Sequence, residues 1–296
     1  MIEFLKAILF GIVEGITEWL PISSTGHLIL LDEFISLNVA PNLDATFAKE
    51  YFSMFEVVIQ LGAILAVVVM FFGKLNPLSP KKDRVQKTNT WKLWGKVLIA
   101  SIPAALIGIV GDKILEKATG KDIDGWIYNW ICVAAALIIY GILFIIIEKK
   151  LAASKNESVV SVDDISCKKA FTVGLFQALS IVPGTSRSGS TSLGSRMIGI
   201  SKEAAAEFSF FMGIPAMAGA SLIKGAGFFS YVLDSDISVP LSAWLVLLVA
   251  SAVAFLVSIA AIKFLMDFIK KHSFAPFGVY RIILGAIVIG YFLIRG

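Results

Sequence analysis

Two glutamates, four hydroxyl side chains and a histidine lie close together near the start of the chain, in a segment that is otherwise apolar. The segment reads Glu14-Gly-Ile-Thr-Glu18-Trp-Leu-Pro-Ile-Ser23-Ser24-Thr25-Gly-His27. Glu14 and Glu18 are four residues apart, so they share one face of a helix. Paired carboxylates are ligands for hard divalent cations, and acids are costly in apolar segments unless function retains them. The pair therefore predicts a site for Mg²⁺ or Ca²⁺, with a structural pair that caps neighbouring backbone groups as the alternative.

A break follows the two glutamates. Pro21 ends the first helix, and the hydroxyls of Ser23 and Ser24 suit the N-cap of a second helix. The N-terminus of that helix predicts an anion site at Ser23, Ser24 and Thr25. Ser24 and His27 share a face, so we expect a nucleophile and a base to converge there, with either residue as the nucleophile. The alternative is a capped turn with a buried, hydrogen-bonded histidine.

A second polar segment reads Pro183-Gly184-Thr-Ser186-Arg187-Ser188-Gly-Ser-Thr191. Arginine suits phosphate because its planar fork donates two parallel hydrogen bonds. The segment therefore predicts phosphate binding by Arg187, and the alternative is an arginine that extends to the membrane surface. The groups expected to help it bind substrate are Gly184, Ser186, Ser188 and Thr191. Supporting residues around the site are expected at Glu56, Gln60, Gln177 and Glu207, for which ordinary polarity at helix ends is the alternative.

The composition indicates an all-α polytopic membrane protein. Apolar residues make up 57% of the 296 residues and charged residues 16%, and the mean hydropathy is +0.84. A soluble domain is nearer half apolar and a quarter charged. The basic residues lie in loops between apolar runs, so the net charge of +4 does not indicate nucleic-acid binding. Six transmembrane helices are predicted at 53–73, 92–111, 126–147, 203–225, 241–264 and 277–294.

Two further segments, 2–34 and 170–199, are broken at Pro21 and at Pro183-Gly184. Their halves are about 10–15 residues long, against the roughly 20 that a span needs, so each segment predicts a re-entrant helical hairpin. Basic loops at 74–96, after 148 and at 263–271 are expected on the cytoplasmic side. This places the first hairpin's entry on the outer face and the second hairpin's entry on the inner face.

The two halves of the chain are similar in sequence. Gly11-Ile-Val-Glu14 matches Gly174-Leu-Phe-Gln177, and the segment from Glu56 to Gly62 matches that from Glu207 to Gly213. With the opposite orientations, this predicts an inverted-topology repeat. The first repeat would span 1–148, a cytoplasmic linker 149–169 and the second repeat 170–296. Gln177 and Ile181 stand where the first repeat has its glutamates, so one site is expected.

The motifs together resemble the undecaprenyl-diphosphate phosphatase family of bacterial membranes, also called bacitracin-resistance proteins. The resemblance rests on Glu14 to Glu18, on Ser23 to His27 and on Pro183 to Thr191. It implies hydrolysis of the lipid carrier's diphosphate to the monophosphate with a divalent cation, in the recycling of cell-wall precursors. It also implies a bacterial inner-membrane enzyme whose active site opens to the outer side.

From the residues and the resemblance together, we expect Glu14 and Glu18 to hold the cation, and Glu18 can also act as a base. We expect Ser24 to be the nucleophile, with His27 as base or acid. Arg187 is expected to stabilise the phosphate. The expected partners are undecaprenyl diphosphate and membrane lipids; nucleic acid is not expected, and the oligomeric state is left open, a homodimer included. One alternative function is a transporter or flippase of a polyprenyl phosphate lipid. Another is a lipid phosphatase that uses two histidines, but His272 is expected on the opposite side from His27.

Overall fold

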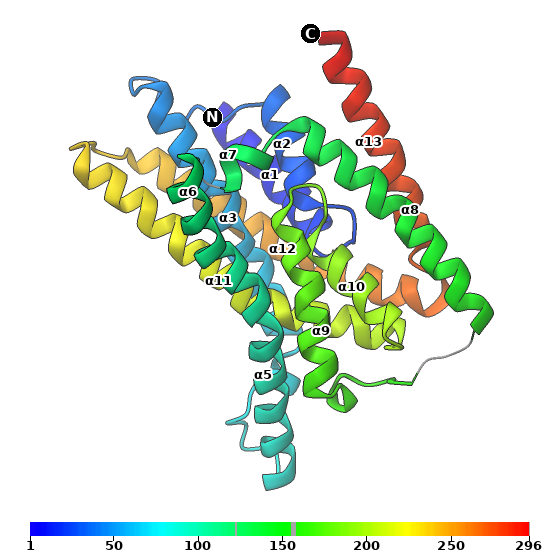
Figure 1. Cartoon of the computed structure of the whole chain (residues 1–296). Coiled ribbons are helices and arrows are strands. Elements are labelled where there is room, and N and C mark those ends of the chain that lie inside the picture. Colours follow the sequence, from blue (N-terminus) through cyan, green and yellow to red (C-terminus); the bar gives the residue numbers. More distant parts are fainter. Residues whose placement is uncertain (122, 155–157, 296) are drawn as a thin grey trace.

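The computed structural model describes residues 1–121, 123–154 and 158–295, and this part of the chain is built of helices (Figure 1). The first predicted repeat contains α1 (Ile2–Thr17), α2 (Ser24–Phe34), α3 (Ala45–Met70), α4 (Phe72–Leu75), α5 (Arg84–Ala105), the π-helical turn η1 (Leu106–Gly111), α6 (Asp112–Thr119), α7 (Ile123–Ile127) and α8 (Trp130–Ser154). The rest contains the 3₁₀ turn η2 (Val162–Asp164), α9 (Cys167–Ala178), the 3₁₀ turn η3 (Leu179–Ile181), α10 (Arg187–Met197), α11 (Lys202–Asp234), α12 (Leu241–Lys271) and α13 (Ala275–Arg295). Lys155, one of the residues of the predicted linker, lies outside the described residues.

Within the described residues, six helical segments are long and apolar enough to cross a membrane, which confirms the predicted all-α polytopic fold. They are α3, the continuous run Arg84–Thr119, α8, α11, α12 and α13. The helices extend beyond the predicted ranges because polar caps start them outside the apolar centre. Asp44, Asp83 and Ser201 are such caps, and their side chains accept hydrogen bonds from the backbone N–H groups of Phe47, Gln86 and Ala204 respectively.

Two of the spans contain a proline, as predicted: Pro103 lies within α5 and Pro215 within α11. Proline lacks the N–H group that would bond to the preceding turn, and it crowds the carbonyl four residues earlier. The π-helical turn η1 begins at Leu106, close after Pro103. Such single wide turns occur preferentially at functional sites.

The first helix of each broken segment packs on a span of the other half of the chain. Helix α1 lies along α12, and α9 lies along α5. Both contacts depend on a glycine: a Cβ atom at Gly11 would lie 2.5 Å from the carbonyl oxygen of Ala250, and one at Gly174 would lie 2.2 Å from that of Ala100. Helices α8 and α13 run side by side (Figure 1). Whether the halves are inverted repeats, and whether the broken segments enter from opposite membrane faces, stays a prediction.

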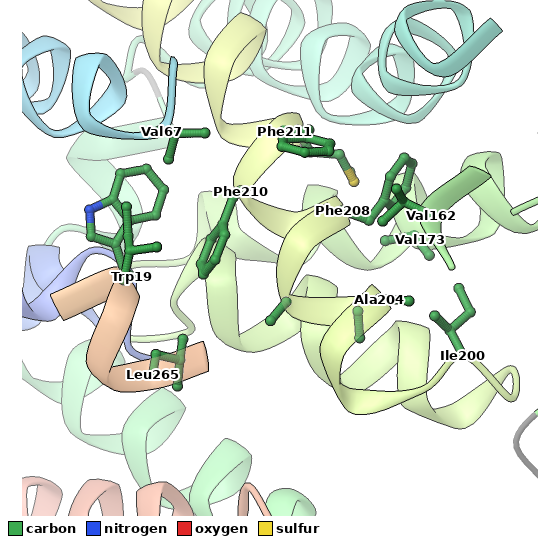
Figure 2. Packing of buried hydrophobic residues seen from close by; sticks show 14 of the residues in the cluster. Trp19, Val67, Val162, Val173, Ile200, Ala204, Phe208, Phe210, Phe211 and Leu265 are labelled. Carbon is green, nitrogen blue, oxygen red and sulfur yellow. The ribbon is translucent and has the colours of Figure 1, made fainter. Parts of the chain in front are cut away.

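A core of large side chains holds the first break against the second half of the chain (Figure 2). Trp19, which follows α1, is fully buried, and its ring meets that of Phe210 on α11 edge-on at 5.3 Å. Phe208 and Phe211 of the same helix are also buried in this core. Aromatic side chains bury large apolar areas, and edge-to-face pairs add to that stabilisation. The polar residues beside Trp19 are thereby fixed relative to α10 and α11.

Candidate active site

The two breaks have the same local construction. Helix α2 starts after Ser23 and α10 after Ser186, and these serines adopt positive φ angles of 78° and 71°. Each serine side chain accepts a hydrogen bond from the N–H group of the glycine three residues on, at 3.2 Å for Gly26 and 3.1 Å for Gly189. A positive φ is uncommon for a residue other than glycine and costs of order 1–3 kcal/mol where it is strained. Each serine thus caps one N–H group of its helix, and a helix N-terminus of this kind is a place where an anion can bind.

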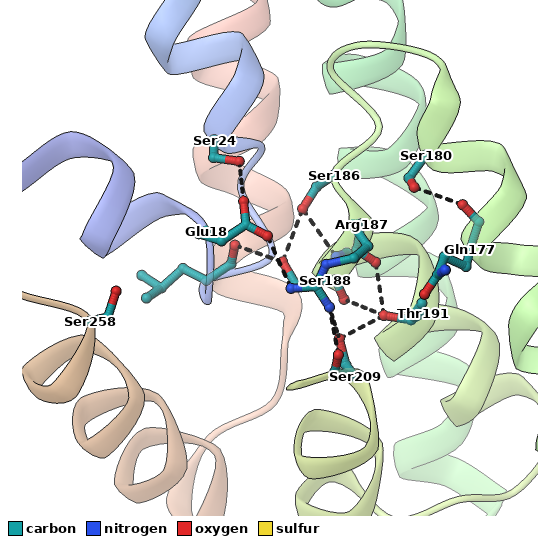
Figure 3. A network of polar contacts seen from close by, with 12 residues as sticks. Glu18, Ser24, Gln177, Ser180, Ser186, Arg187, Ser188, Thr191, Ser209 and Ser258 are labelled. Carbon is teal, nitrogen blue, oxygen red and sulfur yellow. Dashed lines mark hydrogen bonds and ion pairs between the residues drawn. The ribbon is translucent and has the colours of Figure 1, made fainter. Parts of the chain in front are cut away.

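Glu18 connects the two breaks (Figure 3). Its Oε2 accepts a hydrogen bond of 2.5 Å from the hydroxyl of Ser24, which is the first residue of α2. Its Oε1 lies 3.0 Å from Nη2 of Arg187, the first residue of α10. All three side chains are largely buried. The carboxylate is therefore placed to take the Ser24 proton, and Arg187 stabilises its negative charge in a medium of low dielectric.

Residues of α11 hold the Arg187 side chain in place. Its Nη1 donates to the carbonyl oxygen of Ser209 at 2.5 Å, and the Ser209 hydroxyl pairs with that of Thr191 at 2.7 Å. A Cβ atom at Gly213 would lie 3.0 Å from the guanidinium carbon, so the glycine leaves room for this side chain. The guanidinium also lies 5.7 Å from the ring centre of Trp19. These contacts fix the planar fork in one orientation.

Two of the hydroxyls predicted to bind substrate contribute to this framework. Thr191 donates to the carbonyl oxygen of Arg187 at 2.8 Å, and Ser188 donates to that of Leu20 at 3.2 Å. Thr191 and Ser188 are both buried. Ser188 thereby connects α10 to the first break, and both residues position the segment that was predicted to bind phosphate.

The predicted convergence of Ser24 and His27 is not what the structure shows. Nδ1 of His27 lies 2.7 Å from the carbonyl oxygen of Ser23, and Nε2 lies 2.7 Å from the hydroxyl of Tyr280 on α13, whose ring stacks on the imidazole. Ser24 instead donates to Glu18. The shared helix face was correctly predicted, but the backbone carbonyl and Tyr280 engage both ring nitrogens. The hydrogen-bond acceptor next to Ser24 is the Glu18 carboxylate.

Glu14 is fully buried, and neither of its carboxylate oxygens has a hydrogen-bond partner. A buried carboxylate without a partner is costly, so it must be protonated or face a cation. Gln177, the matching residue of the second half, is also buried, and its side-chain oxygen has no partner. No cluster of three or more histidine, cysteine, aspartate or glutamate side chains in the described part of the chain is arranged to hold a metal. Any cation here would need oxygen ligands beyond the glutamates.

The residues that were predicted to support the site lie in different parts of the structure. Gln60 and Gln177 line the cavity described below. Both carboxylate oxygens of Glu56 accept from the Tyr128 hydroxyl, at 2.8 and 2.7 Å. Glu207 forms an ion pair with Lys74 at 2.8 Å and is not among the residues that line the cavity. The predicted supporting role of Glu207 is therefore not reflected in its contacts, because Lys74 engages its carboxylate.

A cavity of about 450 Å³ brings the reactive groups together. At one end it is lined by Glu18, Ser24 and Arg187, and the polar residues beside them are Ser23, Thr25, Gln60, Gln177 and Ser186. Gly184 also lines it; its φ of +90° and its close approach to the backbone of Val133 require a glycine. The other walls are mostly apolar. A ligand with a charged head and an apolar tail matches this division.

Arg281 of α13 is a functional candidate that the sequence reasoning missed. The side chain is fully buried. Its Nη1 donates to the carbonyl oxygen of Pro21 at 3.2 Å, and its Nη2 donates to those of Gly184 and Thr185 at 2.7 and 2.9 Å. One guanidinium thus joins both breaks. The signal was present, since a charged residue inside an apolar span marks a functional site by default.

Comparison with known proteins identifies the family of the chain. Residues 7–287 match the family model described as bacitracin resistance protein BacA. The chain is 51% identical over 290 residues to an undecaprenyl-diphosphatase of Enterococcus faecalis, covering 97% of each chain. It is 50% identical over 294 residues to one of Acetivibrio thermocellus, covering 99% of each, and 50% identical over 301 residues to one of Lactococcus lactis, covering 99% of this chain and 98% of the relative. The family match and these relatives show that the chain belongs to the bacitracin resistance protein BacA family.

Proposed function

We propose that this membrane protein is an undecaprenyl-diphosphatase, which hydrolyses undecaprenyl diphosphate to undecaprenyl phosphate and inorganic phosphate. The observation that carries the proposal is the Glu18 carboxylate, bonded on one side to the Ser24 hydroxyl and on the other to Arg187, in a cavity with apolar walls. The relatives of about 50% identity are named for this activity. Their names favour a hydrolase over a transporter or flippase.

Ser24 is proposed as the nucleophile and Glu18 as its base. The Ser24 oxygen attacks the distal phosphorus while its proton passes to Glu18 over the 2.5 Å hydrogen bond. The bond from that phosphorus to the bridging oxygen breaks, and the lipid monophosphate leaves with the bridging oxygen. Water then attacks the phosphorus of the phosphorylated serine, and the bond from that phosphorus to the serine oxygen breaks. Glu18 returns its proton to the serine oxygen, and the protons of the water remain on the inorganic phosphate that is released. Phosphoryl transfer depends mainly on such positioning and on charge stabilisation.

Arg187 is proposed to bind the non-bridging oxygens of the diphosphate. In the structure its Nη2 is paired with Glu18. Protonation of Glu18 during the attack removes the negative charge from that pair and leaves the guanidinium free to bind the developing charge on phosphate. The N–H groups at the starts of α2 and α10 would add partial positive charge on either side. His27 would act on this network through Ser23 and not by contact with Ser24.

A divalent cation fits the unpartnered carboxylate of Glu14. Glu14 with Glu18 would hold it, and the bound ion would neutralise charge on the diphosphate. Glu14 has no other evident role, because neither of its oxygens accepts a hydrogen bond.

The proposed setting is the bacterial inner membrane, with the cavity reached from the extracytoplasmic side and the product recycled for peptidoglycan synthesis. Bacitracin resistance would follow from removal of the lipid diphosphate. The charge pattern of the loops supports this orientation. Cysteines placed at the exposed positions Asn42 and Ser235 should label with an impermeant reagent from outside, and one at Asn89 from inside only. Labelling of all three from one side would contradict the inverted orientation.

The activity is tested by phosphate release from undecaprenyl diphosphate with purified protein, with and without a chelator. The wild type should release phosphate, a chelator should abolish the release, and Mg²⁺ or Ca²⁺ should restore it. Ser24→Ala should retain its fold and lose most of the activity. Absence of phosphate release by the wild type with either ion would overturn the proposed function, whereas release that survives the chelator would overturn only the role of the cation.

A further inference from the structure

The cavity has a second end that the chemistry does not use. Gly108 and Ile109 of η1 line this part of the cavity, together with Pro215, Gly219 and Ile223 of α11. These five residues carry no ionisable or hydrogen-bonding side chain; Lys224, which follows Ile223, also lines the cavity. Gly213 of α11 lies beside Arg187, and Ile223 is ten residues further along the same helix. We call this end the η1–α11 seam.

The seam reaches the outer surface of the helix bundle. Ile109 and Ile223 line the cavity, and they are also 47% and 57% exposed. None of the six residues of η1, all of which the structure describes, is buried. In a membrane-spanning helix, exposed isoleucines face hydrocarbon. The cavity therefore meets the lipid phase at the seam.

Two glycines leave the seam open. A Cβ atom at Gly219 would meet no atom within 4 Å, and one at Gly108 would meet only the end of the Ile181 side chain at 4.0 Å. These glycines thus differ from Gly11 and Gly174, where neighbouring backbone occupies the space. Close helix packing therefore does not explain why glycines stand at positions 108 and 219. What these two positions share is open space beside the chain, next to the wide helical turn η1.

We propose that the prenyl chain of the lipid diphosphate leaves the cavity through the η1–α11 seam and enters the bilayer there. This inference rests on the proposed function, since it takes the substrate to be a prenyl diphosphate. The diphosphate must lie at the end of the cavity that holds Arg187 and Ser24. A cavity of about 450 Å³ suits a drug-sized ligand, so it holds the headgroup and only the first prenyl units. The rest of an undecaprenyl chain must pass an apolar wall, and the seam provides one that opens to lipid.

The direct test is protection of a cysteine in the seam. Gly219→Cys is made in a chain whose native Cys132 and Cys167 are replaced by alanine, and the rate of its reaction with N-ethylmaleimide is measured in detergent. A non-hydrolysable undecaprenyl methylenediphosphonate should slow this reaction at least fivefold, and inorganic methylenediphosphonate should leave it unchanged. The matched control is Gly225→Cys, on the same helix, where a Cβ would also meet nothing within 4 Å but which does not line the cavity. Its labelling should not respond to either compound.

If the lipid analogue slowed labelling equally at both cysteines, or did not slow it at Gly219→Cys, the proposal that the prenyl chain leaves through the η1–α11 seam would be wrong. A Gly219→Cys variant that does not label even without ligand would contradict the open space on which the proposal depends. A kinetic arm compares Gly219→Leu with Gly225→Leu, which gain similarly in helix propensity. Gly219→Leu should lower kcat/KM for undecaprenyl diphosphate at least tenfold, and Gly225→Leu should leave it unchanged.

The two proposals fail in distinguishable ways. If the wild type releases phosphate but the lipid analogue does not protect Gly219→Cys, the seam is wrong and the proposed function stands. If the wild type releases no phosphate from undecaprenyl diphosphate, the proposed function fails whatever the labelling shows.

Discussion

The first and second breaks have turns of the same construction, but they carry different functional side chains. In both, a serine with positive φ starts a helix and accepts the N–H group of a glycine three residues on. The first break adds Glu18 and Ser24, whereas the second adds Arg187. The acid and the proposed nucleophile are thus in one break, and the fixed positive charge is in the other. Neither break alone could both attack a diphosphate and stabilise its charge, so the site exists only where the two meet.

Arg281 lies on α13, outside both breaks, and it contacts both of them. It donates to a carbonyl oxygen of the first break and to two of the second. Arg281 thereby holds the two breaks next to each other. Arg187 and Arg281 therefore have different tasks: Arg187 is proposed to bind phosphate, and Arg281 positions the segments that form the site.

The largest effect is expected for the acid of the first break. Glu18→Gln removes the base for Ser24 but keeps a side chain of the same shape. General-base removal costs typically 10²–10⁴-fold, so we expect kcat to fall by about that factor. The matched control is Glu207→Gln, whose glutamate pairs with Lys74 away from the cavity. Steady-state phosphate release should show near-normal turnover for the control, and equal losses in the two variants would show that the cavity was assigned wrongly.

A smaller effect is expected for the arginine of the second break. Arg187→Lys keeps the charge and loses the planar fork, so we expect a cost on the order of 1–3 kcal/mol in transition-state stabilisation, measured from kcat/KM. Arg187→Ala should lose more. If Arg187→Lys were as active as the wild type, the fork would have no role and Arg187 would act only as a point charge.

Arg281→Lys should act on both breaks at once. A lysine cannot donate to three carbonyl oxygens in the same geometry, so we expect roughly a tenfold loss of kcat/KM together with a lower unfolding temperature. The measurements are steady-state kinetics and thermal unfolding in detergent, with Arg295→Lys at the end of α13 as the control. A fall in stability without any change in kinetics would make Arg281 a structural residue only.

The smallest effect is expected for His27. Its imidazole contacts Ser23 and Tyr280 and not Ser24, so His27→Ala should change the pH profile of kcat and lower its maximum by less than about tenfold, below the usual range for a primary acid or base. Tyr280→Phe should produce a similar but weaker change. A loss as large as that of Glu18→Gln would show that His27, and not Glu18, is the base.

The sequence predicted those features that depend on local pattern. Apolar runs predicted the spans, Pro21 and the serines predicted the first break, and Glu18, Ser24 and Arg187 stood out as polar groups in apolar segments. Contacts between distant segments could not be predicted in this way. The spacing of Ser24 and His27 on one helix gave no information on Tyr280, which lies more than 250 residues further on and engages the imidazole.

Other misses have the same origin. Ser209 is an ordinary residue of a long helix by sequence, and only its place behind Arg187 gives it a role. Glu207 was predicted to support the site, but in the structure its carboxylate forms an ion pair with Lys74. Arg281 is different, because a single arginine within the apolar span 277–294 could have been recognised from the sequence.

The central claim is that both breaks act on one substrate as a unit. It is tested most directly by a double-mutant cycle in kcat/KM between Ser24→Ala and Arg187→Ala, one from each break. These residues bond to opposite oxygens of Glu18. Members of one catalytic unit are strongly non-additive, so the double variant should be at least tenfold more active than the product of the two single losses implies, a coupling of about 1.4 kcal/mol. Losses that simply multiply would contradict a shared site.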